Sequence, residues 1–161
     1  MQNIDLICIG KMNASYFAQG VAEYQKRLGG FCNFHIIELP EVQIADKNAS
    51  DKQIAKALQK EGEAILASVR KGAYLVALCV EGKQISSEEL AAMLADRAIS
   101  GAGDIAFVIG SSHGLDDSVK RAAQARISMG RITLPHQLAR LVLTEQLYRA
   151  CTINAGMKYH K

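Results

Sequence analysis

The chain has 161 residues, a formal net charge of +3 at pH 7, 49% hydrophobic residues and 22% charged residues. A chain of this length can bury about two-thirds of its unfolded surface in one core, so we expect a single domain over residues 1–161. No apolar run approaches the roughly 18 residues that a membrane span needs, and the N-terminal residues are typical of a strand, not of a signal peptide. These features argue against a membrane protein and predict a cytoplasmic one.

Four cysteines stand singly along the chain: Cys8, Cys32, Cys79 and Cys151. They form no CxxC pair, and no His or Cys lies at zinc spacing from them. Single thiols within apolar runs usually pack as small hydrophobic side chains. We therefore predict buried free thiols and no metal site.

The charge is distributed unevenly. Residues 1–117 carry 11 Lys and Arg against 15 Asp and Glu, whereas residues 118–161 carry 8 Lys and Arg against Glu145 alone. A positive face built by one end of a chain is typical of phosphate or RNA contact. The charge alone is equally compatible with a solvated helix surface.

The N-terminal part of the chain predicts a strand, a helix and a second strand. Residues 1–10 form a mostly apolar strand. The apolar residues that follow recur with the 3.6-residue period of a helix until Gly29 and Gly30 end it. Residues 33–39 form the next strand, which Pro40 ends.

Two capping boxes mark the starts of the next two helices. Ser50 and the glutamine three residues later begin a helix over residues 51–70, after a polar loop. Ser86 and the glutamate three residues later begin a helix that ends near Gly101. Each box should stabilise its helix by about 1 kcal/mol.

Two almost continuous apolar runs, residues 73–80 and 105–109, are typical of central strands covered on both faces. Residues 81–83, Glu-Gly-Lys, predict a turn after the first of them. The remaining predicted elements are a short helix, a brief strand and a long helix over residues 116–125, 126–128 and 136–153. Strands that alternate with helices predict an α/β fold with a mostly parallel sheet flanked by helices.

Two glycine-punctuated loops in the C-terminal third are the best candidates for a ligand site. One covers residues 110–114, directly after a strand, and the other covers residues 128–134, directly before the last helix. Parallel sheets bind ligands beyond the carboxyl ends of their strands, so we expect both loops to line one site. The chain lacks GxGxxG and the P-loop pattern, which argues against the usual dinucleotide and ATP chemistries.

The first of these loops also matches the G-x-S-x-G pattern of serine hydrolases, with Ser112 as the nucleophile. Asp116 and Asp117 lie only four and five residues further on, within the helix that such a nucleophile would begin. The chain is also short for that fold. A hydrolase is therefore the weakest of the interpretations.

Three stretches of the C-terminal third stand out together: FVIGSSHGL at 107–115, SMGRITLPHQLARLVLTEQLYRA at 128–150 and KYHK at 158–161. They closely resemble the bacterial RlmH family of small SPOUT-class methyltransferases, which act on a pseudouridine of large-subunit ribosomal RNA. The resemblance continues upstream, in order, through Gly10-Lys11, Glu61-Gly62 and Gly82-Lys83, and it covers nearly the whole chain.

The resemblance implies a SPOUT-type fold with a C-terminal trefoil knot and a homodimer. It implies S-adenosylmethionine as the methyl donor and N3 of a pseudouridine in 23S rRNA, within the assembled ribosome, as the acceptor. No metal is required. The alternative is a non-catalytic module that binds an adenosyl group or a nucleotide, and the intact Tyr-His-Lys tail argues against it.

The resemblance also implies the residues that contact the cofactor: Leu78, Gly110, Met129, Gly130, Arg131, Ile132, Thr133 and Leu134. Backbone groups of a tight loop can bind the adenine edge while aliphatic side chains flank its faces, although for each aliphatic side chain alone a place in the core is the favoured explanation. The family has a second glycine after Gly110, where this chain has Ser111. If that backbone needs a positive φ, the serine costs stability or narrows the pocket.

Methyl transfer to the imide nitrogen requires removal of its proton, and the C-terminal tail and the last helix supply the candidates. His160 is a proton acceptor or orienting group, Tyr159 a stacking or hydrogen-bonding partner, and Arg149 an anion contact that can instead pair with Glu145. The candidates for RNA contact are Arg140, Lys158 and Lys161. The apolar residues of the last helix fit either a dimer interface or the chain's own core: Leu141, Leu147 and Tyr148.

Overall fold

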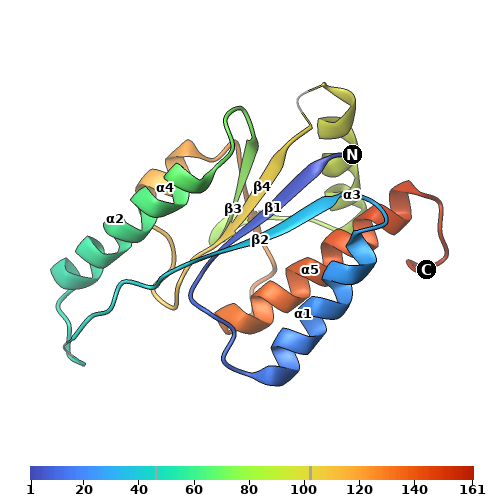
Figure 1. The fold of residues 1–161 in the computed structure, drawn as a ribbon. Coiled ribbons are helices and arrows are strands. Elements are labelled where there is room, and N and C mark those ends of the chain that lie inside the picture. Colours follow the sequence, from blue (N-terminus) through green and yellow to red (C-terminus); the bar gives the residue numbers. More distant parts are fainter. Residues whose placement is uncertain (46, 102) are drawn as a thin grey trace.

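A twisted sheet with helices on both faces forms the body of the molecule (Figure 1). The structure is a computed structural model, and it describes residues 1–45, 47–101 and 103–161. The strands are β1 (Asn3–Ile9), β2 (Asn33–Leu39), β3 (Tyr74–Gln84), β4 (Ile105–Ile109) and β5 (Ala125–Ser128). They pair in the order β2-β1-β4-β3-β5, and every pairing is parallel. The predicted α/β fold is confirmed.

Two hydrophobic clusters lie on opposite faces of this sheet. The helices are α1 (Ser15–Leu28), α2 (Asp51–Ser68), α3 (Ser87–Ile99), α4 (Asp117–Ala122) and α5 (His136–Asn154). Leu6 and Phe107 face α1, α3 and α5, whereas Ile7 and Val108 face α2 and α4. Neighbouring residues of a strand point to opposite faces, which is why the central strands are apolar almost without interruption.

Both predicted capping boxes are present. The Ser50 hydroxyl accepts from the backbone N–H of Gln53, and the Gln53 side chain accepts in return from the backbone N–H of Ser50. Ser86 and Glu89 repeat this arrangement at the start of α3. The predicted helix starts are therefore confirmed at these two places.

The predicted turn at residues 81–83 is wrong, because β3 continues to Gln84. Leu78 and Lys83 both pair with Ile127 of β5, so β3 bulges between them. A Cβ atom on Gly82 would lie 2.5 Å from the carbonyl carbon of Ile127. The glycine thus serves the close approach of two strands and not a turn.

The cysteine prediction is confirmed in part. All four thiols are free, and Cys8 and Cys32 are buried. Cys79 and Cys151 are partly exposed, so the prediction of burial is wrong for these two. Among the described residues, no three His, Cys, Asp or Glu side chains gather as a metal ion would need.

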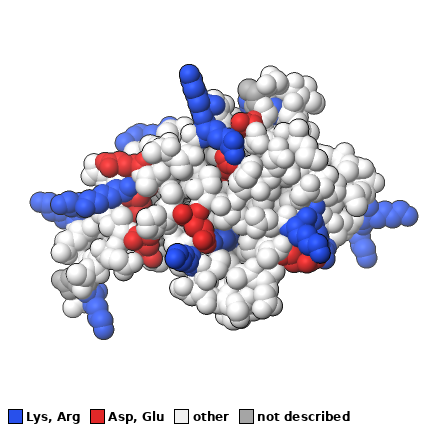
Figure 2. Space-filling view, in the orientation of Figure 1, with Lys and Arg blue, Asp and Glu red and all other residues white. Residues whose placement is uncertain are grey.

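Three of the eight Lys and Arg residues over 118–161 form ion pairs with acidic residues of the described chain. The ion pairs are Lys120–Glu81, Arg140–Glu38 and Arg149–Glu145. On the face in Figure 2, Lys and Arg side chains are interspersed with Asp and Glu. Folding therefore neutralises part of the excess of positive charge that the sequence shows in this segment.

No described helix is both long and apolar enough to cross a membrane. The trefoil knot stays a prediction.

Candidate functional site

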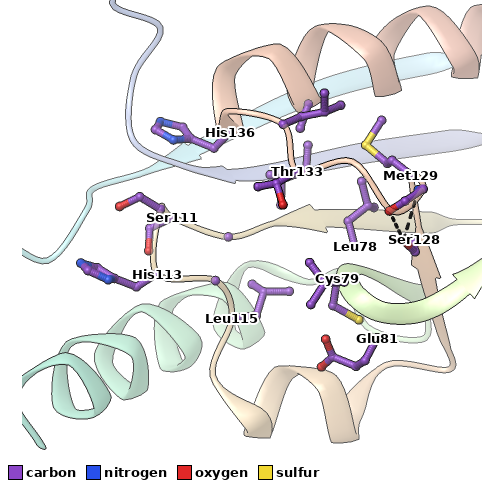
Figure 3. Close-up of a pocket in the computed structure, with 18 of the residues that line it drawn as sticks. Leu78, Cys79, Glu81, Ser111, His113, Leu115, Ser128, Met129, Thr133 and His136 are labelled. Atoms are coloured by element: carbon purple, nitrogen blue, oxygen red, sulfur yellow. Dashed lines mark hydrogen bonds between the residues drawn. The ribbon is translucent and has the colours of Figure 1, made fainter. Parts of the chain in front are cut away.

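A cavity of about 390 Å³ opens at the carboxyl end of β4 and beside residues 78–81 of β3 (Figure 3). Its walls are these residues of β3, the loop after β4, the loop between β5 and α5, and the first turn of α5. Figure 3 shows Leu78, Leu115 and Thr133 around it. Gly110 and Gly130 both line this cavity, so the two glycine-containing loops meet as predicted.

The loop after β4 is a tight turn that requires its two glycines. The backbone N–H of Gly114 donates to the carbonyl oxygen of Ser111 at 2.9 Å, and Gly114 has a φ of 92°. A Cβ atom on Gly110 would collide with the carbonyl group of Gly114. Gly110 therefore allows the turn to fold back over the end of β4.

Ser111 causes none of the strain that a positive φ would bring. Among the described residues, every positive φ belongs to a glycine, so the serine backbone is in an ordinary conformation. Its hydroxyl is buried and donates to Oε1 of Glu61 at 3.0 Å. Ser111, where the resemblance to the RlmH family predicts a glycine, thus has a hydrogen-bond partner on α2.

The second loop is held by its own serine. The Ser128 hydroxyl accepts from the backbone N–H of Gly130 at 3.2 Å and donates to the carbonyl oxygen of the same residue at 3.0 Å. Gly130 has a φ of 123°, which favours glycine. This compact turn directs the residues that follow it towards the cavity.

Seven of the eight residues predicted to contact a cofactor line the cavity: Leu78, Gly110, Met129, Gly130, Ile132, Thr133 and Leu134. Arg131 is the exception, because it is exposed and absent from the cavity wall. Ile132 is 80% exposed, so a place in the core does not explain this side chain. The structure therefore assembles the predicted set but leaves out its arginine.

Sequence reasoning missed the polar groups that β3 brings to the cavity. Cys79 lines it from within the predicted strand, Glu81 lines it from the part of β3 beyond the predicted end, and Lys120 joins them from α4. Glu81 Oε1 lies 2.6 Å from Lys120 Nζ. This hydrogen bond lowers the pKa of the Glu81 carboxyl and raises the pKa of the Lys120 ammonium. The cavity thus contains an opposite-charge pair beside apolar walls.

Tyr159 and His160 of the tail lie with Arg149 at the far end of α5. Arg149 Nη2 lies 2.6 Å from Glu145 Oε1, and the Tyr159 hydroxyl donates to the same oxygen at 3.0 Å. His160 Nδ1 lies 3.2 Å from Arg149 Nη1, and its Nε2 lies 2.7 Å from Glu88 Oε1. A guanidinium only donates, so Nδ1 accepts, while the Nε2–H group donates to Glu88.

Two of the three candidates are held in their protonated forms. Burial raises the pKa of the Tyr159 hydroxyl, and hydrogen bonds with Tyr24 and Glu145 raise it further. The hydrogen bond to Glu145 raises the pKa of the Arg149 guanidinium. Both groups therefore keep their protons and donate, which leaves the imidazole of His160.

Within one chain, the tail is separated from the cavity. Ala139 lines the cavity, and Arg149 lies ten residues further along α5, which is about 15 Å of helix. Figure 1 shows the C-terminus near the red end of α5, opposite the orange end where that helix begins. The fold therefore brings together the predicted cofactor residues, but it does not bring His160 to them.

The predicted RNA contact of Arg140 does not agree with its position. Its side chain is 2% exposed, Nη1 lies 2.6 Å from Glu38 Oε2, and Nη2 donates to the carbonyl oxygen of Gly10 at 3.0 Å. A guanidinium enclosed in this way supports the fold and does not reach a phosphate. Lys158 and Lys161 are exposed.

The residues proposed for a dimer interface pack within the chain itself. Leu147 and Tyr148 belong to the cluster on the α5 side of the sheet. Leu141 packs so closely against α1 that a Cβ atom on Gly20 would lie 2.9 Å from its Cδ1. Of the two alternatives for these residues, the structure supports packing in the chain's own core.

Solved structures place this fold in a known class. A probable methyltransferase from Bordetella pertussis Tohama I aligns with a TM-score of 0.55 at 17% identity, over 92% of this chain and 93% of that chain. A putative methylase family protein from Neisseria gonorrhoeae aligns with a TM-score of 0.60 at 13% identity, over 99% of this chain and 87% of that chain. At these identities the likeness concerns the fold alone, and it is the fold of methylase proteins.

Sequence relatives narrow the class further. A family model described as "Predicted SPOUT methyltransferase" matches residues 2–160. Proteins named "Ribosomal RNA large subunit methyltransferase H" from Ligilactobacillus salivarius and Pediococcus pentosaceus are each 50% identical, over 99% of this chain and 99% of each relative. The chain belongs to the SPOUT methyltransferase family. This membership sets aside the serine-hydrolase interpretation of Ser112.

Proposed function

We propose that this chain methylates N3 of a pseudouridine in 23S rRNA, in the cytoplasm and on the assembled ribosome, with S-adenosylmethionine as the methyl donor. The observation that carries the proposal is the convergence of the Gly110 and Gly130 loops on one cavity. Relatives at half identity over the full length bear the name of a large-subunit ribosomal RNA methyltransferase, which supports the substrate class.

The cavity is suited to an adenosyl group. Its volume of about 390 Å³ lies within the range of small-ligand sites. The turns at Gly110 and Gly130 expose backbone groups that can bind the edge of a base, and Leu78 and Ile132 can flank its faces. The amino-acid end of the cofactor carries one ammonium and one carboxylate, which Glu81 and Lys120 complement in charge.

When bound, the cofactor supplies a methyl group on a positively charged sulfur. The chain's part is to hold the two loops so that the target nitrogen meets this methyl group in line. It must also remove the N3 proton or stabilise the anion that forms. His160 is our candidate for the proton acceptor, with Arg149 and Tyr159 as donors that hold the imidazole and the base.

The distance between tail and cavity leads to the second part of the proposal. His160 can act at the cavity only if a second copy of the chain delivers it, so we propose a homodimer in which each tail serves the partner's cavity. Exposed apolar side chains beside the cavity support such a contact: Val80 is 84% exposed and Ile132 is 80% exposed. Lys158 and Lys161, on the same tail, are proposed to contact the RNA.

The experiment uses radiolabelled S-adenosylmethionine and ribosomes from cells that lack the modification. Digestion of the RNA after incubation should yield label in a methylated pseudouridine of 23S rRNA. Free 23S rRNA serves as the control for dependence on the assembled ribosome. Cofactor binding without transfer would instead support the non-catalytic module, and a chain that neither binds nor transfers would contradict both.

A further inference from the structure

Glu61 is a buried carboxylate that lies outside the cavity, on α2, and is 4% exposed. Each of its oxygens accepts a hydrogen bond from a different part of the chain. Oε1 accepts from the Ser111 hydroxyl at 3.0 Å, and Oε2 accepts from the backbone N–H of Val42 at 3.0 Å. One side chain therefore joins α2 to the loop after β4 and to the segment after β2.

Hydrophobic packing alone does not explain a carboxylate at this position. A buried carboxylate loses its hydration, and it is tolerated only where hydrogen bonds replace the water. Hydrogen bonds to a charged acceptor are also stronger than those between neutral groups. An apolar side chain could pack α2 against the sheet, but it could not hold the Ser111 hydroxyl and the Val42 backbone.

The same turn of α2 also contacts the segment that leads from the loop over residues 110–114 into α4. A Cβ atom on Gly62 would lie 3.1 Å from Cβ of Asp116 and 3.2 Å from Oγ of Ser118, so α2 lies directly against the start of α4. Asp116 caps α4 by accepting from the backbone N–H of Ser118. The loop over residues 110–114 is thus held by α2 at Ser111 and again where it enters α4.

We propose that Glu61 is a positioning residue for methyl transfer. Through Ser111 it holds the 110–114 loop in the shape that lines the cofactor cavity, although Glu61 itself does not line that cavity. This inference rests on the proposed function, because it assumes that the cavity binds S-adenosylmethionine. If this is so, loss of the Glu61–Ser111 contact lowers cofactor affinity by more than the accompanying decrease in Tm explains.

The test compares Ser111→Ala, Glu61→Gln and the double variant as full-length chains. Binding of S-adenosylhomocysteine is measured by calorimetry, and KM for cofactor and for ribosomes is measured in the methyl-transfer assay. We expect Ser111→Ala to bind about five- to tenfold more weakly, as for the loss of one buried hydrogen bond. Glu61→Gln should bind about two- to threefold more weakly, because its amide oxygen still accepts from Ser111 but is a weaker acceptor than a carboxylate. The double variant should bind about as weakly as Ser111→Ala, because both changes act on the same contact. KM for cofactor should rise while KM for ribosomes stays unchanged.

Ala55→Gly is the matched control, because Ala55 is an exposed residue of the same helix and glycine weakens a helix without touching the loop. It should lower Tm and leave cofactor affinity unchanged. Wild-type cofactor affinity in both Ser111→Ala and Glu61→Gln would overturn the proposal. So would a loss of affinity no larger than the loss that Ala55→Gly shows for the same decrease in Tm. Ser111→Ala decides the matter if Glu61→Gln does not fold. A wild-type chain without cofactor binding would overturn the proposed function as well, whereas failure in the variants alone concerns only Glu61.

Discussion

Arg140 and Glu38 form an ion pair in which Nη1 lies 2.6 Å from Oε2, and only the carboxylate side of the pair reaches solvent. The second Nη group of Arg140 donates to the carbonyl oxygen of Gly10 at 3.0 Å. Gly10 follows β1 and Glu38 lies on β2, so one guanidinium fastens α5 to the ends of two strands. It does so beside Cys8, where burial raises the pKa of the thiol to about 12.

Replacement of Arg140 by alanine should therefore reduce stability. We expect Arg140→Ala to lower the free energy of unfolding by about 2 to 3 kcal/mol, because it removes a buried pair whose other member is partly solvated. Glu38→Gln should cost about 1 kcal/mol, since the amide oxygen still accepts a hydrogen bond. Urea unfolding followed by circular dichroism measures both. Wild-type stability in Arg140→Ala, together with weaker ribosome binding, would restore the RNA contact.

The position of Arg140 shows what a count of charges along a sequence cannot reveal. The excess of basic residues in the last third is real, but its partners include Glu38 and Glu81, which are distant in sequence. The sequence holds no local signal for such pairs, because they depend on the order of the strands. The contact between Arg149 and Glu145 was foreseeable, because a spacing of four residues places both on one face of a helix.

Local motifs were predicted correctly, whereas contacts between distant segments were not always predictable. Ser50 and Ser86 predicted helix starts correctly, because a capping box is a local motif whose partners lie three residues apart. Gly82 suggested a turn but serves the close approach of β3 and β5, which no local pattern indicates. The meeting of the Gly110 and Gly130 loops was predictable, since ligand sites in parallel sheets lie at the carboxyl ends of strands. The distance from His160 to that site was not.

The space around Gly110 gives a sharp prediction about cofactor binding. A Cβ atom there would collide with the backbone of Gly114, so Gly110→Ala must displace the cavity loop. We expect cofactor affinity to fall by roughly tenfold or more, which corresponds to a loss of at least about 1.4 kcal/mol of binding free energy. Gly72→Ala is the control, because Gly72 has a φ of 78° and open space around it, away from the cavity. It should destabilise the chain by about 1 kcal/mol without a change in affinity. Calorimetric titration distinguishes the two, and equal affinities would contradict the role of the loop.

Cys79 should report cofactor binding through its reactivity. Burial raises the pKa of this thiol, so we expect its alkylation to be slower than that of free cysteine at the same pH. The rate should rise with pH, because only the thiolate reacts. S-adenosylhomocysteine should slow it further, since Cys79 lines the cavity. Peptide mass spectrometry after iodoacetamide treatment measures this residue by residue. Cys151, partly exposed and absent from the cavity wall, is the internal control, and equal protection of both thiols would contradict the assignment.

The remaining prediction concerns which chain supplies the tail. His160 contacts Arg149 and Glu88 of its own chain, about 15 Å of helix beyond the cavity-lining Ala139. His160→Ala, or deletion of residues 158–161, should abolish methylation and leave cofactor affinity largely unchanged. A variant that keeps its turnover would show that the tail takes no part in the reaction.

Mixed dimers can show whether a tail acts at the cavity of its own chain or at the cavity of the partner. Gly110→Ala weakens the cavity and spares the tail, whereas His160→Ala does the reverse, so each variant alone should show little or no activity when the cofactor concentration is kept far below the weakened Kd of Gly110→Ala. When equal amounts of the two chains are refolded together, half of the dimers are mixed, and each mixed dimer combines one intact cavity with its partner's intact tail. We therefore expect about a quarter of wild-type activity if the tail serves the partner. No activity would indicate that each tail serves its own chain. As the control, a chain that carries both changes should restore nothing to either single variant, because it has neither an intact cavity nor an intact tail to contribute.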